Sequence, residues 1–525
     1  MMKFRRICAL VLSLSVAAAG FCGCGSKEEA ATGPSAGFNK EGYPIMNEKT
    51  DLKVMGCTNG TLPDDWNDLY AFKKMEEMTN LHLNFTLYSS VNYNEKKNLA
   101  FASGDLPDFF FKGSISTEDE TSYGAYGTLV DLKPYLIYAP NVRKTFEDYP
   151  EVEPSVTMDD GKIIVLPEIN DVPRDRATKM WINKQWLDKL GLAEPQTTDE
   201  LYEVLKKFKT GDPNGNGAAD EIPISFCATD QLRMMLGAFG LLYPLYAENG
   251  KVIYSPADER HKDGLNFFTK LFKEKLLDDQ CFTQTFDKMA SKSSGEKATL
   301  GCFINSGAGS VVGADNAGQY DILTPLQSKE GGRVWRANNV FLKGAFAMTE
   351  KNPHKEATIR YIDYLYSEEG GRLMRYGIEG ETYKFLDNGL WTYILPEGMT
   401  ATEFVSSISP SSGAATPIRQ PSEFLAKTSH EGTIRLNKQS EKLAPYLTVP
   451  YPSVYYSDAE QKKINALRTD LDNCAEEFTA RVITGEANID EEWSGYIAKL
   501  EKIGLKEYTE LSQKKYDEYQ KKMKK

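Results

Sequence analysis

The clearest pattern of apolar and polar positions lies between residues 181 and 225. Apolar side chains there recur at intervals of three and four residues, which gives one apolar helix face made of Leu201, Val204, Leu205 and Phe208. Thr197 is followed three residues later by Glu200, a capping box that satisfies backbone N–H groups at a helix start. Lysines crowd the last turn, and Gly211 can end the helix. The pattern predicts a helix over 198–209.

Short apolar runs alternate with amphipathic segments along most of the chain, which predicts an α/β fold. The runs that indicate strands are Leu52–Cys57, Leu83–Leu87, Phe109–Phe111, Ile163–Leu166, Ile222–Cys227 and Leu300–Ile304. The segments that indicate further helices are Trp66–Met78, Val91–Ala102, 184–190, 257–276 and one that starts at Asn352–Pro353. After about residue 457 the pattern is helical and highly charged. We expect a helical C-terminal region there.

Residues 1–23 have the composition of a signal peptide. Three basic residues precede a short apolar run from Ile7 to Ala19, which is shorter than a membrane-spanning helix needs. Small Gly23 then stands before Cys24, which we expect to be the lipidated first residue of the mature chain. One alternative is lipidation of Cys22, which would require cleavage after bulky Phe21, and the other is ordinary signal-peptidase cleavage, with Cys24 lost or left free. Residues 24–44 are expected to contain this cysteine and a flexible tether, because the stretch is rich in Gly, Ser, Ala and Glu.

The charge of the chain limits the partners it can have. Removal of the signal peptide takes three basic residues and no acidic ones, which leaves 59 basic against 75 acidic residues and a net charge of −16. This excess of acid argues against nucleic acid and an anionic membrane surface as main partners. The five cysteines after Cys24 have neither paired spacing nor metal-ligand spacing, so we expect no disulfide framework and no zinc site.

An acidic loop with calcium-ligand spacing follows the helix over 198–209. Side chains that carry oxygen alternate in it, with Gly217 placed for a sharp turn, at Asp212, Asn214, Asn216, Asp220 and Glu221. Three carboxylates within ten residues repel one another without a cation, which favours a structural Ca²⁺. The alternative is an ordinary exposed turn, since Asn, Gly and Pro form turns in any case. Pro223 occupies the twelfth position, where an EF-hand has glutamate.

The same loop, together with four further segments in the same order, resembles extracellular solute-binding lipoproteins of ABC-type sugar importers, especially the calcium-carrying oligosaccharide binders. The segments are ASGDLPDFFF (102–111), GTLVDLKPY (127–135), DGKIIVLP (160–167) and YIDYLYSEEGGRLMRYGIEGETY (361–383). The resemblance spans roughly residues 50 to 390. It implies that the loop uses the adjacent pair Asp220–Glu221 and the backbone carbonyl of Ala218 as further calcium ligands.

The resemblance also implies a two-lobed, periplasmic-binding-protein-like type II fold with an interlobe cleft. We assign residues 45–172 and 340–395 to lobe one, and residues 173–339 and 396–525 to lobe two. The chain is then expected to cross between the lobes near 171–178, near 338–344 and again around 390–405.

Candidate ligand-binding residues are those expected at loop ends that face the cleft. Sugars present apolar C–H faces that stack on aromatic rings, while polar side chains bind their hydroxyl groups. From the residue types and their places we select Trp66, Trp181, Trp335, Arg336, Glu379, Tyr383 and Trp391. Asn59 and Lys112 follow predicted strands, where the resemblance implies ligand contacts in lobe one. The alternative for each aromatic residue is core packing.

The sequence does not contain a catalytic constellation that we can recognise. The four histidines are scattered, no serine stands in a nucleophile-elbow pattern, and the acidic pair Glu368–Glu369 points in two directions on a helix. We therefore expect a binding protein, anchored by lipid at the extracellular face, that is monomeric and delivers an oligosaccharide to an ABC permease. The alternatives are a surface carbohydrate-binding lipoprotein or sensor co-receptor without transport, and, third, a secreted glycoside hydrolase.

Overall fold

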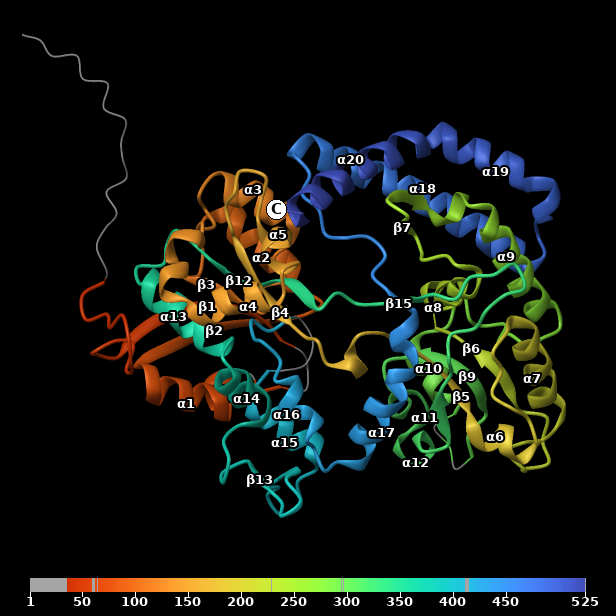
Figure 1. Cartoon of the computed structure of the whole chain (residues 1–525), viewed down its shortest axis with the longest axis horizontal. Helices are drawn as coiled ribbons and strands as arrows, with labels where there is room; N and C mark the ends of the chain where they lie inside the picture. Colours follow the sequence, from red (N-terminus) through yellow and green to blue (C-terminus); the bar gives the residue numbers. More distant parts are fainter. Residues whose placement is uncertain are drawn as a thin grey trace, which may run out of the picture. The chain divides into compact units, whose positions relative to one another are not determined.

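The computed structural model describes residues 35–58, 62–63, 65–227, 229–293, 295, 297–410 and 415–524. All of them belong to one unit of the chain, which begins at Ser35. Two separate sheets, each with its own hydrophobic core, divide this unit into two groups of elements (Figure 1). We call them lobe one and lobe two.

Lobe one is built on a five-stranded sheet. Its strands, in spatial order, are β2 (Leu81–Ser89), β1 (Thr50–Thr58), β3 (Phe109–Phe111), β12 (Phe341–Met348) and β4 (Val165–Ile169). β12 runs antiparallel to both of its neighbours, whereas β1 is parallel to β2 and β3. All three phenylalanines of β3 are fully buried, as expected for a central strand that is covered on both faces.

The helices that cover this sheet come from distant parts of the chain. They are α1 (Tyr70–Thr79), α2 (Tyr93–Ser103), α3 (Thr117–Ala125), α4 (Pro140–Asp148), α5 (Val152–Val156), α13 (Lys355–Leu365) and α14 (Glu368–Tyr376). α15 (Ala401–Ile408) and α16 (Ser422–Ala426) also pack in lobe one, against α14. A Cβ at Gly371 of α14 would lie 2.2 Å from the Arg419 carbonyl oxygen, so only glycine permits this approach.

Lobe two is built on a four-stranded sheet of β10 (Tyr320–Ile322), β5 (Lys179–Asn183), β9 (Leu300–Asn305) and β6 (Ile222–Ser225). β6 and β9 are parallel, and β5 is antiparallel to β9 and β10. Its shorter helices are α6 (Lys184–Lys189), α7 (Thr198–Thr210), α8 (Thr229–Met234), α10 (Phe286–Ser291), α11 (Gly309–Val312) and α12 (Ala314–Ala317). The capping box predicted at Thr197 and Glu200 is present at the start of α7, and Gly211 ends it.

Long C-terminal helices complete lobe two, which confirms the predicted helical region. α18 (Asp458–Thr484) packs against α9 (Glu259–Lys273), followed by α19 (Ile489–Ile503) and α20 (Leu505–Met523) (Figure 1). Three two-stranded ribbons join the larger elements: β7 (Leu245–Glu248) with β8 (Lys251–Tyr254), β11 (Trp335–Arg336) with β15 (Leu447–Thr448), and β13 (Tyr383–Phe385) with β14 (Trp391–Tyr393). Within the described part of the chain, no helix has both the length and the apolar character that crossing a membrane requires.

Three segments of the chain connect lobe one with lobe two. The chain leaves β4 for β5 through residues 170–178, and it returns from β11 to β12 through residues 337–340. The third crossing differs from the prediction around 390–405, because residues 396–426 stay with lobe one. Thr416 N–H and Gln420 Nε2 both donate to the Glu168 carboxylate at the end of β4, at 3.0 and 2.7 Å.

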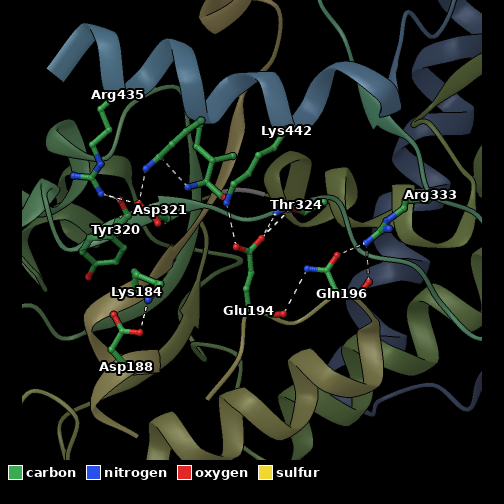
Figure 2. A network of polar contacts seen from close by, with 12 residues as sticks. Lys184, Asp188, Glu194, Gln196, Tyr320, Asp321, Thr324, Arg333, Arg435 and Lys442 are labelled. Atoms are coloured by element: carbon green, nitrogen blue, oxygen red, sulfur yellow. Dashed lines mark hydrogen bonds and ion pairs between the residues drawn. The ribbon is translucent and has the colours of Figure 1, made fainter. Parts of the chain in front are cut away.

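Polar contacts fix the segment after residue 430 on lobe two (Figure 2). Arg435 of α17 (Glu431–Ser440) pairs with Asp321 of β10 at 2.7 Å, and Lys442 pairs with Glu194 at 3.1 Å. Glu194 also accepts hydrogen bonds from the backbone and hydroxyl of Thr324. The third crossing therefore lies at residues 427–430.

Besides the three crossings, a cluster of buried charged groups also connects the lobes. The Glu120 carboxylate on α3 is fully buried, and it accepts a 2.6 Å hydrogen bond from the Tyr455 hydroxyl. Lys343 of β12 lies 3.0 Å from the same carboxylate and 2.9 Å from the same hydroxyl. Gly344, with φ +74°, allows β12 to bulge here, since a Cβ would lie 2.1 Å from the Ile115 carbonyl oxygen. This contact ties the segment before α18 to lobe one.

Candidate functional site

Two adjoining cavities lie where the chain crosses between the lobes. Cavity one has a volume of about 800 Å³ and is lined by residues of both lobes. Cavity two has a volume of about 640 Å³ and is lined mainly by residues of lobe two. Four residues line both cavities: Tyr243, Pro244, Arg336 and Asn338. Cavities of this size at an interface between lobes are the usual place for a small ligand.

The lobe-one wall of cavity one is made of polar groups at the end of β4. Glu168 is the last but one residue of this strand, Asn170 directly follows the strand, and Gln420 joins them from the segment before α16. Glu168 is held by Thr416 and Gln420, and the amide of Asn170 donates to Asp175 at 3.2 Å. These groups are fixed by their partners, so they present donors and acceptors in set directions to a ligand with many hydroxyl groups.

The lobe-two wall lies at the carboxyl ends of β6 and β9, which is where ligands bind in open α/β sheets. Asn305 is the last residue of β9 and Ser306 follows it, and Gln231 and Arg233 come from α8. The Arg233 guanidinium lies 4.1 Å from the centre of the Tyr243 ring. This wall combines amide, hydroxyl and guanidinium groups with one aromatic ring.

Two groups near this wall have shifted pKa values. Burial, above all, lowers the pKa of Lys179 at the start of β5 to about 8, although its ammonium donates to the Arg174 carbonyl. Burial also raises the pKa of Asp472 in cavity two, although the Tyr254 hydroxyl donates to this carboxylate at 3.0 Å. Both shifts arise because the protein interior solvates a charge less well than water does.

Trp181 and Trp335 lie behind the cavities rather than in them, which differs from the cleft-facing position that the sequence suggests. Each is about 4% exposed and belongs to the core of lobe two. Their indole N–H groups donate to the carbonyl oxygens of Asn305, at 2.9 Å, and Thr178, at 2.7 Å. Since Asn305 and Thr178 both line cavity two, the two tryptophans hold its wall in place.

The other predicted aromatic residues are also buried. Trp66 is fully buried in the core of lobe one, among Phe72, Phe85 and Phe111. Trp391 and Tyr383, each 2% exposed, form a small cluster with Phe424, on which the Trp391 ring stacks. In this structure, these residues therefore pack in hydrophobic cores, which is the alternative that the sequence left open for each of them. Glu379 is exposed beside this cluster, and neither cavity includes it.

The remaining predicted ligand residues fall in three different places. Arg336 lines both cavities and donates to the Tyr243 carbonyl oxygen at 3.0 Å. Lys112 does follow β3, but it is fully buried and donates to the Pro410 carbonyl oxygen at 2.6 Å. Burial lowers the pKa of Lys112 to about 8. Asn59 lies outside the described residues. Contact of any of these residues with a ligand stays a prediction.

The acidic loop lies on the surface of lobe two, and its residues line neither cavity. The backbone N–H groups of Asn216 and Gly217 donate to Asp212, while the amides of Asn214 and Asn216 donate to Asp220 at 2.9 and 2.8 Å. Among the described residues, no group of three or more His, Cys, Asp or Glu side chains is gathered closely enough to hold a metal ion.

The donor chemistry of the loop nevertheless suits calcium. All candidate ligands are oxygens, which a hard cation prefers. One oxygen of Glu221, Oε1, is buried without a hydrogen-bond partner, and burial raises the pKa of this carboxyl. A buried carboxylate oxygen with no donor costs free energy unless a cation or a proton meets it.

The sequence reasoning missed most of the residues that line the cavities. Glu168, Asn170 and Asn305 each stand at or just after the carboxyl end of a strand, so a rule based on strand ends finds them. Tyr243 and Gln420 lie in irregular segments, and no pattern in the sequence marks them.

The chain belongs to the family of bacterial extracellular solute-binding proteins, whose sequence pattern matches residues 59–372. This membership confirms the resemblance seen in the sequence and the two-lobed α/β fold that it implies. Members of the family bind solutes and are not enzymes, in agreement with the sequence-based expectation.

Two similar proteins, FusA and YtcQ, are named for the saccharides that they bind, and FusA also has solved structures. The fructooligosaccharide ABC transporter substrate-binding protein FusA of Streptococcus pneumoniae serotype 4 is 30% identical over 558 residues, which cover 99% of each chain. The structure of a FusA EF-hand mutant in complex with fructo-nystose has 28% identity and a TM-score of 0.75, and the match covers 90% of this chain and 99% of that one. The polygalacturonan/rhamnogalacturonan-binding protein YtcQ of Bacillus subtilis is 26% identical over 332 residues, 60% of this chain and 63% of that protein. The chain is thus homologous to substrate-binding proteins of sugar ABC transporters.

Proposed function

We propose that this protein captures an oligosaccharide in the two adjoining cavities and delivers it to the permease of an ABC importer. The observation that carries the proposal is the place of the cavities. Cavity one is walled by Glu168 and Gln420 from lobe one and by Tyr243 and Arg336 from lobe two, so one ligand contacts both lobes at once. The full-length similarity to a fructooligosaccharide-binding protein supports the same class of ligand.

The mechanism follows from this two-sided contact. A ligand that contacts both walls binds the closed state, in which the lobes are close together, more tightly than the open state. It therefore shifts the population toward the closed state, which the permease recognises. The crossings at residues 170–178, 337–340 and 427–430 are the segments that change conformation in this movement.

The protein acts outside the cell and at the membrane in this proposal. Cys24, which lies outside the described residues, carries the lipid, and the mature protein meets the permease as a monomer. The support for the anchor is the sequence of basic residues, apolar run and Gly–Cys pair.

We also propose that the loop over 212–221 binds one structural Ca²⁺. Asp212, Asn214, Asn216, Asp220 and Glu221 would supply side-chain oxygens, and Ala218 its carbonyl oxygen. The partnerless Glu221 oxygen supports this assignment, as does the EF-hand named for the related FusA structure. The ion would bring the loop carboxylates together and fix the turn after α7, far from the cavities.

The test of the function is a titration of the purified mature chain with a panel of tetrasaccharides, namely nystose, maltotetraose, cellotetraose and tetragalacturonate. Calorimetry measures the affinity, and small-angle scattering measures the radius of gyration. We expect at least one saccharide to bind and to lower the radius of gyration at saturation. If none of the four binds, the proposed function is wrong.

A further inference from the structure

Tyr243 has a special position among the aromatic residues of the site. It is the one aromatic residue, within the described part of the chain, that lines both cavities. It lies in the irregular segment between the buried turn that ends at Gly240 and the strand β7, and its side chain is only partly buried. A ligand that extends from one cavity into the other therefore passes this ring.

The surroundings of Tyr243 hold its ring in one orientation. The Arg233 guanidinium covers one face at 4.1 Å from the ring centre, a cation–π contact. Arg233 is 4% exposed and is itself fixed by Glu476, which lies 3.2 Å from its Nη1. On the backbone side, Arg336 donates to the Tyr243 carbonyl oxygen at 3.0 Å. A ring that is already ordered loses little conformational entropy when a ligand binds to it.

The tryptophans cannot serve as such a surface in this structure, because all four that the sequence analysis selected are 4% exposed or less. We propose that Tyr243 is the aromatic platform on which a sugar ring stacks at the junction of the two cavities, and that the bound saccharide is uncharged. This inference rests on the proposed function. It names one residue of that site that contacts the ligand, and it specifies that the ligand is uncharged. The stacked sugar would present its apolar C–H face to the ring face opposite Arg233.

The charges that line the cavities argue for an uncharged ligand. Among the described residues, the two cavities are lined by four carboxylates and four guanidinium groups, whose formal charges cancel: Glu168, Asp175, Asp472, Glu476, Arg233, Arg336, Arg375 and Arg468. Arg233 is already paired with Glu476, and Arg336 is engaged by a backbone carbonyl.

An acidic saccharide would have to bury carboxylates next to Glu168 and Asp472 without a surplus of positive charge. Burying an unpaired charge is strongly unfavourable, whereas hydroxyl groups exchange water for fixed donors and acceptors at little cost. The acidic balance of the whole chain, −13 before processing, adds a long-range repulsion of the same sign.

The first test compares variants of one ring. Tyr243→Ala is expected to weaken the binding of the uncharged tetrasaccharides of the panel roughly ten- to a hundred-fold, as for a buried aromatic contact. Tyr243→Phe keeps the flat ring and should retain most of the affinity that Tyr243→Ala loses. Tyr202→Ala is the matched control, because Tyr202 is also a partly buried tyrosine of lobe two with a cation over its ring, here Lys270, but it lines neither cavity.

The control is expected to leave affinity unchanged. Thermal unfolding of each variant shows whether it is folded, and Tyr243→Leu, which keeps an apolar side chain without the flat face, replaces Tyr243→Ala if that variant does not fold. If the non-aromatic variant binds as tightly as the wild type, the platform assignment is wrong.

The second test is the charge of the ligand. We expect nystose, maltotetraose or cellotetraose to bind and tetragalacturonate not to bind. Binding of tetragalacturonate, alone or as tightly as an uncharged saccharide, overturns the charge assignment but leaves the proposed function standing. Absence of binding by all four overturns the proposed function, and this inference with it.

Discussion

Acidification to pH 5.0 should destabilise the folded protein by about 2 kcal/mol through one side chain, that of His261. This histidine, on α9, is 1% exposed, and no group of the described residues forms a hydrogen bond with either ring nitrogen. Burial and, second, the nearby Arg233 lower the pKa of His261 to about 3, while Asp258 acts weakly in the opposite direction.

The sign and the size follow from proton linkage. Between pH 6.5 and 3 the unfolded chain binds a proton at this histidine and the folded chain does not, so stability falls as the pH falls through this range. At pH 5.0 the ratio of protonated to neutral histidine in the unfolded chain is about 30, which corresponds to about 2 kcal/mol. Because pH 5.0 lies above the folded-state pKa, the size depends only on the unfolded-state pKa.

The measurement is urea unfolding at pH 7.5 and pH 5.0, followed by circular dichroism, for the wild type, His261→Leu and His261→Gln. The free energy of unfolding that is lost between pH 7.5 and pH 5.0 should be about 2 kcal/mol smaller in both variants than in the wild type, since neither replacement titrates. This difference does not depend on how stable each variant is at pH 7.5. Equal losses in all three proteins would refute the reasoning and would show that His261 is not a buried neutral group.

Four further outcomes are expected. Cys24→Ala should move the protein from the membrane fraction to the soluble fraction, and continued membrane binding would contradict the lipid anchor. A chelator should lower the melting temperature of the wild type but not of Asp212→Ala, because an ion bound only by the folded state stabilises it, and an unchanged wild-type curve would count against calcium. Trp181→Phe should lower the free energy of unfolding by about 1–3 kcal/mol, with a smaller change in the free energy of saccharide binding, since the partly buried Asn305 carbonyl loses its donor; a loss of affinity without a loss of stability would instead indicate a direct ligand contact. Glu120→Ala should cost about 3–5 kcal/mol in urea unfolding, because Lys343 is left buried without its carboxylate, and a cost below about 1 kcal/mol would show that the pair is solvated.

Local elements could be predicted from the sequence because local interactions determine them. The apolar repeat and the capping box at Thr197 and Glu200 are enough to place α7, and the run of three phenylalanines places β3. The charge of the chain and the absence of a recognisable catalytic constellation indicated a binding protein. The acidic loop and four further segments, which occur in the same order as in solute-binding lipoproteins, indicated its family.

Only the tertiary structure decided which lobe residues 396–426 join, and which aromatic rings reach the cavities. The first depends on contacts distant in sequence, such as Gln420 with Glu168, which no local pattern encodes. The second depends on burial: a tryptophan at a strand end is equally suited to stack on a sugar or to fill a core. Trp181 turns inward and binds the Asn305 carbonyl, whereas Tyr243, in a segment without periodicity, lies where the cavities meet. Side-chain direction in such segments is set by packing against the rest of the fold, so the sequence alone leaves it open.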